Sequence, residues 1–484
     1  MSDSLSIKAS EAAPPNADLV LFKKPGEFVP RPFGPSEFSG EEEATALFHG
    51  EDRREIYVGL GGPDTPARNS FRKAGAIAVR KAAAIGAAGI VIDVSQSLAE
   101  VGALVEGLVL GAYEFTEFKS ADPGKKPPKT TLVGPKKSLK AIRETIRRGT
   151  ALAEAVNHTR DLGNRPGSHV TPDSLAASAR ALASEAGLRC RVWNRPALER
   201  EGFGGLLAVG GGSAREPRLI RLDYTAPSKD APTIAVVGKA ITFDSGGLCI
   251  KPAEHLDEMK FDKMGGCVVL GLLKAAAALD LPCNLVGILA AAENMTGPGA
   301  YRPGDVVRTY DGRTVEVINT DAEGRIVLAD ALGYVRTKIK PDLVIDLATL
   351  TGACVVALGE ERAGLFTADS RLAALAGESG DETGERVWRL PMGGEFEEPI
   401  RSKIADVRNL ATTKWGGAST AATFLSRWTA GIPHIHLDIA GPAMAADAKP
   451  FRAPGATGFG VRLVFDLMER WCRPQGGAGK KETT

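Results

Sequence analysis

From about residue 170 onward, β-rich runs and helical runs alternate regularly along the chain. The predicted helices cover 172 to 186, 262 to 279, 325 to 338 and 459 to 471, and the predicted strands cover 189 to 193, 218 to 224, 233 to 243, 284 to 292 and 342 to 348. Strands that alternate with helices are typical of α/β domains. We therefore predict a larger C-terminal α/β domain whose mixed sheet is flanked by helices.

A smaller α/β pattern occupies the N-terminal third of the chain. Residues 56 to 61, 73 to 95 and 106 to 115 alternate short β-rich runs with Ala-rich helical runs. The basic segment SADPGKKPPKT (120 to 130), which we interpret as a solvated turn rather than a nucleic-acid patch, interrupts the pattern. A further strand and a helix ending near Leu162 follow it. The predicted parts are an N-terminal domain over 1 to 150, a C-terminal domain over 160 to 475 and a disordered tail over 476 to 484.

The composition excludes several classes of function. Sixty basic and fifty-nine acidic residues give a net charge of +1, so no global field attracts nucleic acid or a membrane surface. The six cysteines are scattered without a C-x-x-C motif, which is typical of reduced thiols. No secretory signal and no apolar run of the ~18 to 20 residues that span a membrane are visible. We expect a cytoplasmic protein that acts on a small molecule or a peptide.

Asp321, Glu323 and Arg325 occupy alternate positions in NTDAEGR (319 to 325), directly before an apolar helical run. Residues two apart lie on the same side of an extended segment but on opposite sides of a helix. The three side chains can therefore converge only if the helix begins after them. One interpretation is a capped helix start with an Arg–carboxylate pair, and the other is a metal or catalytic site.

A second informative stretch runs from 233 to 266. It places Lys239 inside an apolar strand, Asp244 at the end of that strand, Lys251 after a Gly-Gly turn and Asp262 at the start of a helix. Burial of an ammonium group is costly, so Lys239 either extends to solvent, pairs with Asp244 or serves a site. Strand ends in α/β sheets are where ligands bind. We expect this stretch and the NTDAEGR segment to meet at one edge of the sheet.

Four carboxylates cannot be buried together unless cations offset their repulsion. Their oxygens suit Mg²⁺, Mn²⁺ or Zn²⁺, and two bridged ions would lie roughly 3.5 to 4 Å apart, an arrangement that activates water for hydrolysis. The carboxylates are those of Asp244, Asp262, Asp321 and Glu323.

Histidine offers few ligands for such a site. The six histidines form no H-E-x-x-H motif. His434 and His436 lie on alternate positions of a predicted strand, and they are either ligands or satisfied structural histidines.

These motifs resemble those of the leucyl aminopeptidases, the two-metal cytosolic aminopeptidase family. Their order and spacing agree from about residue 155 to the C-terminus, and the N-terminal third agrees more weakly, through GLVLGAYEFTEFKS. The matching stretches are NTDAEGR (319 to 325), GKAITFDSGG with IKP (238 to 252), DEMKFD (257 to 262), ENMTGPGAYRPGD (293 to 305), ATLTGA (348 to 353) and HLDIAG (436 to 441).

The resemblance implies two divalent metal ions per chain, Zn²⁺ or Mn²⁺, with Mg²⁺ as an option in the exchangeable site. One ion would be held by Asp244, Asp321 and Glu323. The other would be held by Lys239, Asp244, Asp262 and Glu323, so that Asp244 and Glu323 bridge the two.

The resemblance also implies roles in catalysis and substrate binding. Lys251 would be the electrophilic lysine beside the scissile carbonyl, and Arg325 would hold a bicarbonate or water that acts as the base. The residues expected at the substrate are Met259, Thr349, Leu350, Gly352 and Ala440.

Three positions depart from the family pattern. Ala240 stands where Gly is usual, and Lys263 stands where Met is common. Ala443 falls where a larger Met can line the first subsite. None of the three is an expected ligand, so they bear on the shape of the pocket.

The function that follows is a metal-dependent aminopeptidase, which releases leucine and other apolar N-terminal residues from peptides by attack of di-metal-activated water. The expected partners are peptides with a free N-terminus and five further copies of the chain, in a homohexamer built as a dimer of trimers. The alternatives are a two-metal phosphoesterase and a non-enzymatic structural or DNA-binding member of the family. All expected ligands are present, which favours the enzyme.

Overall fold

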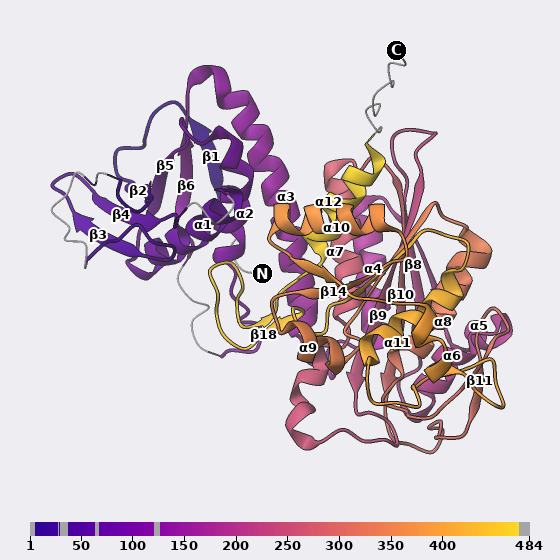
Figure 1. Ribbon diagram of the computed structural model, residues 1–484. Coiled ribbons are helices and arrows are strands. Elements are labelled where there is room, and N and C mark those ends of the chain that lie inside the picture. Colours follow the sequence, from indigo (N-terminus) through magenta and orange to yellow (C-terminus); the bar gives the residue numbers. More distant parts are fainter. Residues whose placement is uncertain (1–4, 28, 30–36, 63–66, 121–125, 474–484) are drawn as a thin grey trace, which may run out of the picture. The chain divides into compact units, whose positions relative to one another are not determined.

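The computed structural model describes residues 5–27, 29, 37–62, 67–120 and 126–473. They form two compact units (Figure 1). One unit combines the chain up to Asn164 with Met444–Thr457, and the other combines Arg165–Ala443 with the chain from Gly458. Both units contain a sheet and helices, so the predicted α/β fold class is confirmed. The predicted tail at 476 to 484 and the turn residues 121 to 125 lie outside the described residues.

The first unit contains a six-stranded sheet with the order β1-β6-β5-β2-β4-β3. Only β3, at the edge, runs antiparallel to its neighbour among these described strands. The strands are β1 (Ile7–Ser10), β2 (Asp18–Lys23), β3 (Thr45–His49), β4 (Arg54–Gly59), β5 (Gly89–Asp93) and β6 (Lys129–Val133).

The run at 106 to 115 belongs mainly to a helix, although its composition is β-rich. It lies in α2 (Val101–Gly111), which packs between α1 (Ala67–Ala84) and α3 (Leu139–Asn164). A Cβ at Gly107 would lie 1.9 Å from the carbonyl oxygen of Arg72, so the glycine lets α1 and α2 approach closely. A helix buried on all sides is apolar all round, and it therefore lacks the period that distinguishes a helix from a buried strand.

The second unit is built on an eight-stranded mixed sheet with the order β15-β14-β17-β13-β9-β10-β8-β7. Its four central strands β17, β13, β9 and β10 are parallel, so their carboxyl ends share one edge of the sheet. The strands are β7 (Arg189–Trp193), β8 (Arg218–Tyr224), β9 (Thr233–Asp244), β10 (Asn284–Asn294), β13 (Leu343–Ala348), β14 (Ala363–Phe366), β15 (Val387–Arg389) and β17 (His434–Asp438).

Helices cover both faces of this sheet (Figure 1). One group, α4, α7, α10 and α12, packs on one face, and a second group, α6, α8 and α11, packs on the other. The helices are α4 (Pro172–Ala186), α6 (Gly204–Val209), α7 (Met264–Leu279), α8 (Gly324–Tyr334), α10 (Ser370–Thr383), α11 (Gly417–Ser426) and α12 (Val461–Cys472). Within the described residues, no helix is both long and apolar enough to cross a membrane.

The predicted elements of this unit agree closely with the structure. The predicted bounds of α4, β7 and β8 are those observed. The start of α4 is encoded locally, because Thr171 and Ser174 form a capping box, Pro172 is the first helical residue and Gly187 ends the helix in the left-handed conformation. The helix predicted over 325 to 338 is α8 followed by a π-helical turn, Val335–Ile339.

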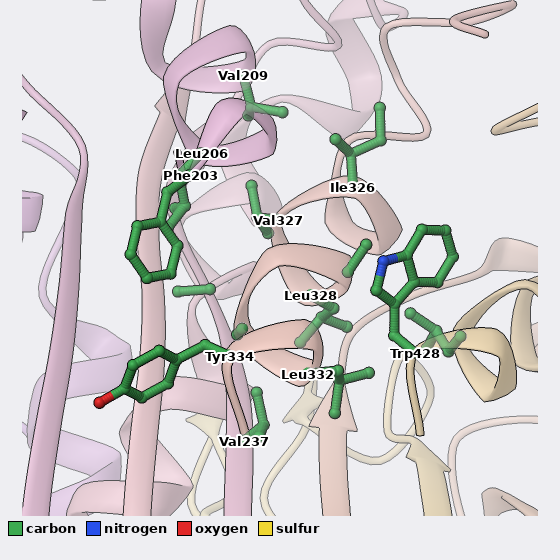
Figure 2. Packing of buried hydrophobic residues seen from close by; sticks show 14 of the residues in the cluster. Phe203, Leu206, Val209, Val237, Ile326, Val327, Leu328, Leu332, Tyr334 and Trp428 are labelled. Atoms are coloured by element: carbon green, nitrogen blue, oxygen red, sulfur yellow. The ribbon is translucent and has the colours of Figure 1, made fainter. Parts of the chain in front are cut away.

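A large hydrophobic core of the second unit surrounds α8 (Figure 2). Every residue of α8 is buried, and its apolar side chains meet Phe203 and Leu206 near α6 and Trp428 after α11. A helix enclosed in this way cannot tilt or slide without loss of packing. The core therefore fixes the start of α8, which is where the NTDAEGR segment ends.

Candidate metal centre and active site

Lys239 lies at the centre of the site, on the middle strand β9. Its side chain is 4% exposed, and its Nζ lies 2.7 Å from Asp262 Oδ1, 2.7 Å from Glu323 Oε1 and 3.0 Å from the carbonyl oxygen of Thr349. A Cβ at Gly324 would lie 2.7 Å from Cε of Lys239, which explains why a glycine follows Glu323. The lysine therefore pairs with carboxylates from two distant segments.

Burial alone would lower the pKa of Lys239, but the negative charges of Asp262, Glu323 and Asp244 outweigh it and raise the pKa. Without a metal ion the amine is therefore an ammonium group. A metal ion bound by Lys239 would have to displace its proton, so binding of the ion would release a proton.

Lys251 is the second lysine that pairs with the carboxylates of the site. Its Nζ lies 2.9 Å from Asp244 Oδ2 and also donates to Asp321 Oδ1. The turn after β9 makes this possible, because Gly246 and Gly247 both adopt positive φ angles, 84° and 65°, that disfavour other residues. Burial alone would lower the pKa of Lys251, but Asp244, Glu323 and Asp321 raise it.

Three of the four carboxylates considered from the sequence lie close together. Oxygens of Asp244, Asp262 and Glu323 lie within 4.8 Å of one another, and Asp321 joins them through Lys251. Burial raises the pKa of Glu323, Asp262 and Asp321, and the charge of Asp244 raises each of them further. Raised pKa values in a group of carboxylates mean that the cations around them do not balance their negative charge.

The arrangement therefore fits divalent cations. Asp262 Oδ2 is buried and has no hydrogen-bond partner within the described part of the chain, so one ligand oxygen is unused. Carboxylate oxygens with one amine suit Mn²⁺, Zn²⁺ or Mg²⁺. A cation here would offset the repulsion that raises the acid pKa values.

Arg325 is the second residue of α8, and its guanidinium hydrogen-bonds a backbone carbonyl. Its Nη1 donates to the carbonyl oxygen of Asn409 over 2.8 Å, and burial lowers its pKa to about 10. No ion pair to a carboxylate is found for it among the described residues, and α8 begins without a side-chain cap. The interpretation of NTDAEGR as a capped helix start with an Arg–carboxylate pair is therefore wrong.

The residues expected at the substrate lie on segments that Asp438 ties together. The backbone N–H groups of Leu350 and Ala440 both donate to Asp438 Oδ1 over 3.2 Å, and Thr351 Oγ1 donates to Oδ2 over 2.6 Å. Thr349 Oγ1 donates to Asp262 Oδ1 over 2.8 Å. Asp438 thus joins the segments that contain Leu350, Thr351 and Ala440.

The other two expected substrate residues lie at element boundaries. Gly352 is the first residue of α9 (Gly352–Leu358). Met259 lies in a 3₁₀ turn, Asp257–Phe261, and its carbonyl oxygen accepts a hydrogen bond from the backbone N–H of Asp262 over 3.3 Å.

His434 and His436 are bound to Asp346 rather than directed at the carboxylate cluster. His434 Nε2 lies 2.6 Å from Asp346 Oδ2, and His436 Nδ1 lies 2.6 Å from Oδ1. Burial alone would raise the pKa of Asp346, but the two histidines lower it to about 2. Asp346 also raises the pKa of His436 against the effect of burial. Of the two alternatives for these histidines, the structure favours the structural one.

The structure accommodates two of the three residues that depart from the family pattern, one by packing and one by hydrogen bonds. Ala240 faces α7, because a Cβ at Gly266 would lie 2.6 Å from the Cβ of Ala240. Lys263 is buried, and its Nζ donates to the carbonyl oxygens of Lys260 and Arg165. Burial lowers the pKa of Lys263 to about 8. Ala443 is also buried.

Sequence reasoning missed several residues that hold this site. Asn409 Nδ2 donates to the carbonyl oxygen of Asn319, and Tyr301 OH donates to that of Thr320 over 2.7 Å. Asp438 and Tyr301 lie inside the motifs HLDIAG and ENMTGPGAYRPGD, so a signal for them existed. Asn409 lies outside every motif singled out, and only the fold brings it to the NTDAEGR segment.

Comparison with known proteins agrees with this geometry. Residues 157–465 match the catalytic domain of the cytosol aminopeptidase family, and residues 35–122 match its N-terminal domain. A probable cytosol aminopeptidase of Roseiflexus castenholzii is 43% identical over 471 residues, with 94% of this chain and 96% of that protein covered. One of Cenarchaeum symbiosum is 43% identical over 422 residues, with 86% of each chain covered.

Solved structures agree as well. A bottromycin maturation enzyme in complex with Mn has a TM-score of 0.87 and 35% identity, with 95% of this chain and 100% of that chain covered. A mutant of tomato leucine aminopeptidase has a TM-score of 0.87 and 30% identity, with 97% of this chain and 98% of that chain covered.

The fold and the carboxylate cluster define a metal-binding hydrolase of the aminopeptidase class, which acts on peptides. The chain belongs to the cytosol aminopeptidase family. Of the three functions considered from the sequence, the family assignment supports the aminopeptidase.

The histidine pair provides a test of which residues hold metal. Asp346→Asn would leave the buried His436 and the partly buried His434 without their charged partner, and we expect roughly 3 to 5 kcal/mol of destabilisation. Bound metal per chain should not change. A loss of metal together with normal stability would contradict this assignment.

The same variant predicts a pH dependence. The lowered pKa of Asp346 contributes stability that is present above the unfolded value of about 3.9 and is lost as pH falls through about 2. The raised pKa of His436 contributes stability that is full below about 6.5 and is lost as pH rises through the folded value. Unfolding curves should therefore show the largest difference between wild type and variant from about pH 4 to 6.5.

Proposed function

We propose that the protein removes leucine and other apolar residues from the N-termini of peptides, with two divalent ions held at the carboxylate cluster. The observation that carries this proposal is the convergence of Asp244, Asp262 and Glu323 within 4.8 Å, with Lys239 buried among them. The proposed ligand sets are Asp244, Asp321 and Glu323 for one ion and Lys239, Asp244, Asp262 and Glu323 for the other.

The ions are proposed to be Zn²⁺ or Mn²⁺, with Mg²⁺ as an option at the exchangeable site. The similar bottromycin maturation enzyme was solved in complex with Mn, which supports Mn²⁺ as the first ion to test. Two such ions, when bound, would supply activated water for attack on the peptide carbonyl and a position for the free α-amino group.

Lys251 is proposed to stabilise the negative charge that develops on the carbonyl oxygen. Its side chain is 15% exposed, against 4% for Lys239, so it is the lysine that a substrate reaches. Its raised pKa keeps it an ammonium group at neutral pH, which the role requires.

Arg325 is proposed to hold a bicarbonate or a water that accepts a proton. Its Nε is buried and has no partner among the described residues, so a donor remains available for an anion. Its pKa, lowered to about 10, still leaves it charged at neutral pH. The substrate wall is proposed to consist of Met259, Thr349, Leu350, Gly352 and Ala440.

The requirement for a free amine gives the first test. We expect leucine p-nitroanilide to be hydrolysed in the presence of Mn²⁺ and its N-acetyl derivative to be inert, because acetylation removes the basicity of the amine. Release of p-nitroaniline from both compounds measures this directly. Similar rates for the two would show that the chain is not an aminopeptidase of the proposed kind, and turnover of p-nitrophenyl phosphate alone would favour the phosphoesterase.

The two lysines give the second test, because the proposal assigns them different roles. Lys239→Met should reduce bound metal toward one ion per chain, since it removes a ligand. Lys251→Met should keep two ions and lower kcat by about 10²- to 10³-fold with a smaller change in KM. Metal analysis and steady-state kinetics of both variants measure these effects. Two tightly held ions in Lys239→Met, or wild-type kcat in Lys251→Met, would mean that the roles are wrong.

We also propose a homohexamer, a dimer of trimers with the C-terminal domains at its centre, located in the cytoplasm. Large apolar side chains exposed on the second unit, among them Val356, Trp415 and Ile404, support burial by other copies. The naming of the relatives as probable cytosol aminopeptidases supports the location.

The hexamer is tested by light scattering. The measured mass should be about six times the 50.8 kDa of one chain, because the exposed apolar surface favours association. A mass of one chain at micromolar concentration would refute the assembly.

A further inference from the structure

The carboxyl end of β9 contains a β-bulge that faces the metal centre. Pairing with β10 is regular from Thr233 to Ile241 and resumes with Asp244 opposite Asn294, after a shift of one residue. Bulges re-aim side chains at the ends of strands. Here the bulge brings the amide of Asn294 against the carboxylate of Asp244, and both residues are buried.

The amide of Asn294 joins two segments of the site. Its Nδ2 donates to Asp244 Oδ1 over 2.8 Å and to the carbonyl oxygen of Thr320, the residue before Asp321, over 3.0 Å. An amide nitrogen carries two hydrogens, so both of its donors are used. The backbone carbonyl of Asn294 also accepts hydrogen bonds from the N–H and the hydroxyl of Ser245 over 2.9 Å.

These bonds leave one oxygen of Asp244 directed at the other charged groups. Asp244 Oδ1 accepts from Asn294 and also from the backbone N–H of Gly246 over 2.9 Å. Asp244 Oδ2 is the oxygen 2.9 Å from Lys251 Nζ. The donors on Oδ1 therefore fix the rotation of the carboxylate.

The orientation of the Asn294 amide leaves one buried acceptor without a hydrogen bond among the described residues, which is energetically unfavourable. Asn294 Oδ1 is buried and has no hydrogen-bond partner within the described part of the chain. Asn294 Oδ1 lies against the Gly246–Gly247 turn, because a Cβ at Gly247 would be 2.9 Å from it. The opposite orientation would direct a carbonyl oxygen at the carboxylate of Asp244, which is worse than one unused acceptor.

We propose that Asn294 is a positioning residue of the metal centre, which holds Asp244 with one oxygen toward the ions and fixes the Thr320–Asp321 peptide. This inference rests on the proposed metal-dependent function. Aspartate at this position would direct an acceptor at two other acceptors, and leucine would supply no donor, although both have nearly the shape of asparagine. Only the amide satisfies both neighbours.

The test compares Asn294→Asp and Asn294→Leu with matched changes at Asn284. Asn284 lies at the other end of the same strand, where its Nδ2 donates to the carbonyl oxygen of Ala231 and its Oδ1 accepts from the backbone N–H of Ala226, both over 3.0 Å. It therefore carries a comparable amide network far from the carboxylates. Full-length proteins are titrated with Mn²⁺ against a chromogenic chelator, and unfolding of the metal-free proteins is followed in parallel.

Both Asn294 variants should bind Mn²⁺ about 10- to 100-fold more weakly than wild type, which is the typical effect of removing a residue that hydrogen-bonds a metal ligand. The Asn284 variants should lower the unfolding temperature without changing Mn²⁺ affinity by more than about twofold. If Asn294 is only structural, its variants will behave like those of Asn284, and unchanged or tighter Mn²⁺ binding in Asn294→Asp overturns the proposal even if Asn294→Leu fails to fold. Failure of wild type to bind Mn²⁺ would overturn the proposed function itself.

Discussion

The interaction on which the site depends is the pairing of Lys239 with Asp262 and Glu323 inside the protein. An ammonium group on a central strand is stable there only if carboxylates reach it from elsewhere in the chain. Asp262 comes from the turn before α7, and Glu323 comes from the start of α8, on the opposite face of the sheet. The charge on β9 therefore constrains the positions of two helices at once.

Glycines around Lys239 make this close approach possible. A Cβ at Gly265, in α7, would lie 2.2 Å from the carbonyl oxygen of Leu347 and 2.9 Å from the backbone nitrogen of Lys239. A Cβ at Gly324, in α8, would overlap the lysine side chain. The enclosed packing of α8 then holds Glu323 in place, because a helix buried on every side has no freedom to withdraw. Packing and charge support the same geometry.

The sheet and the clustered carboxylates can be predicted from the sequence, but the contacts that orient the carboxylates cannot. The strand and helix periods of the second unit predict its central strands and the helices α4, α7, α8 and α12. A lysine in an apolar strand indicates a buried site. The short strands β1 to β3 were missed, since runs of four to six residues such as IKAS carry little periodicity. The elements between 350 and 430, among them the helices α10 and α11, were missed as well. The roles of Asn294 and Asn409 depend on a bulge and on long-range contacts, and neither is encoded by local spacing.

In strand β17, the two-residue period of side chains places three polar residues on one face. His434, His436 and Asp438 lie two residues apart, so their side chains share one face of the sheet. The first two bind Asp346 on the neighbouring strand, and the third accepts hydrogen bonds from the backbone N–H groups of Leu350 and Ala440. Because the histidine pair fixes the register of β17 against β13, it also sets the position of Asp438. The contacts of His434 and His436 with Asp346 therefore bear on where the segments bound by Asp438 lie.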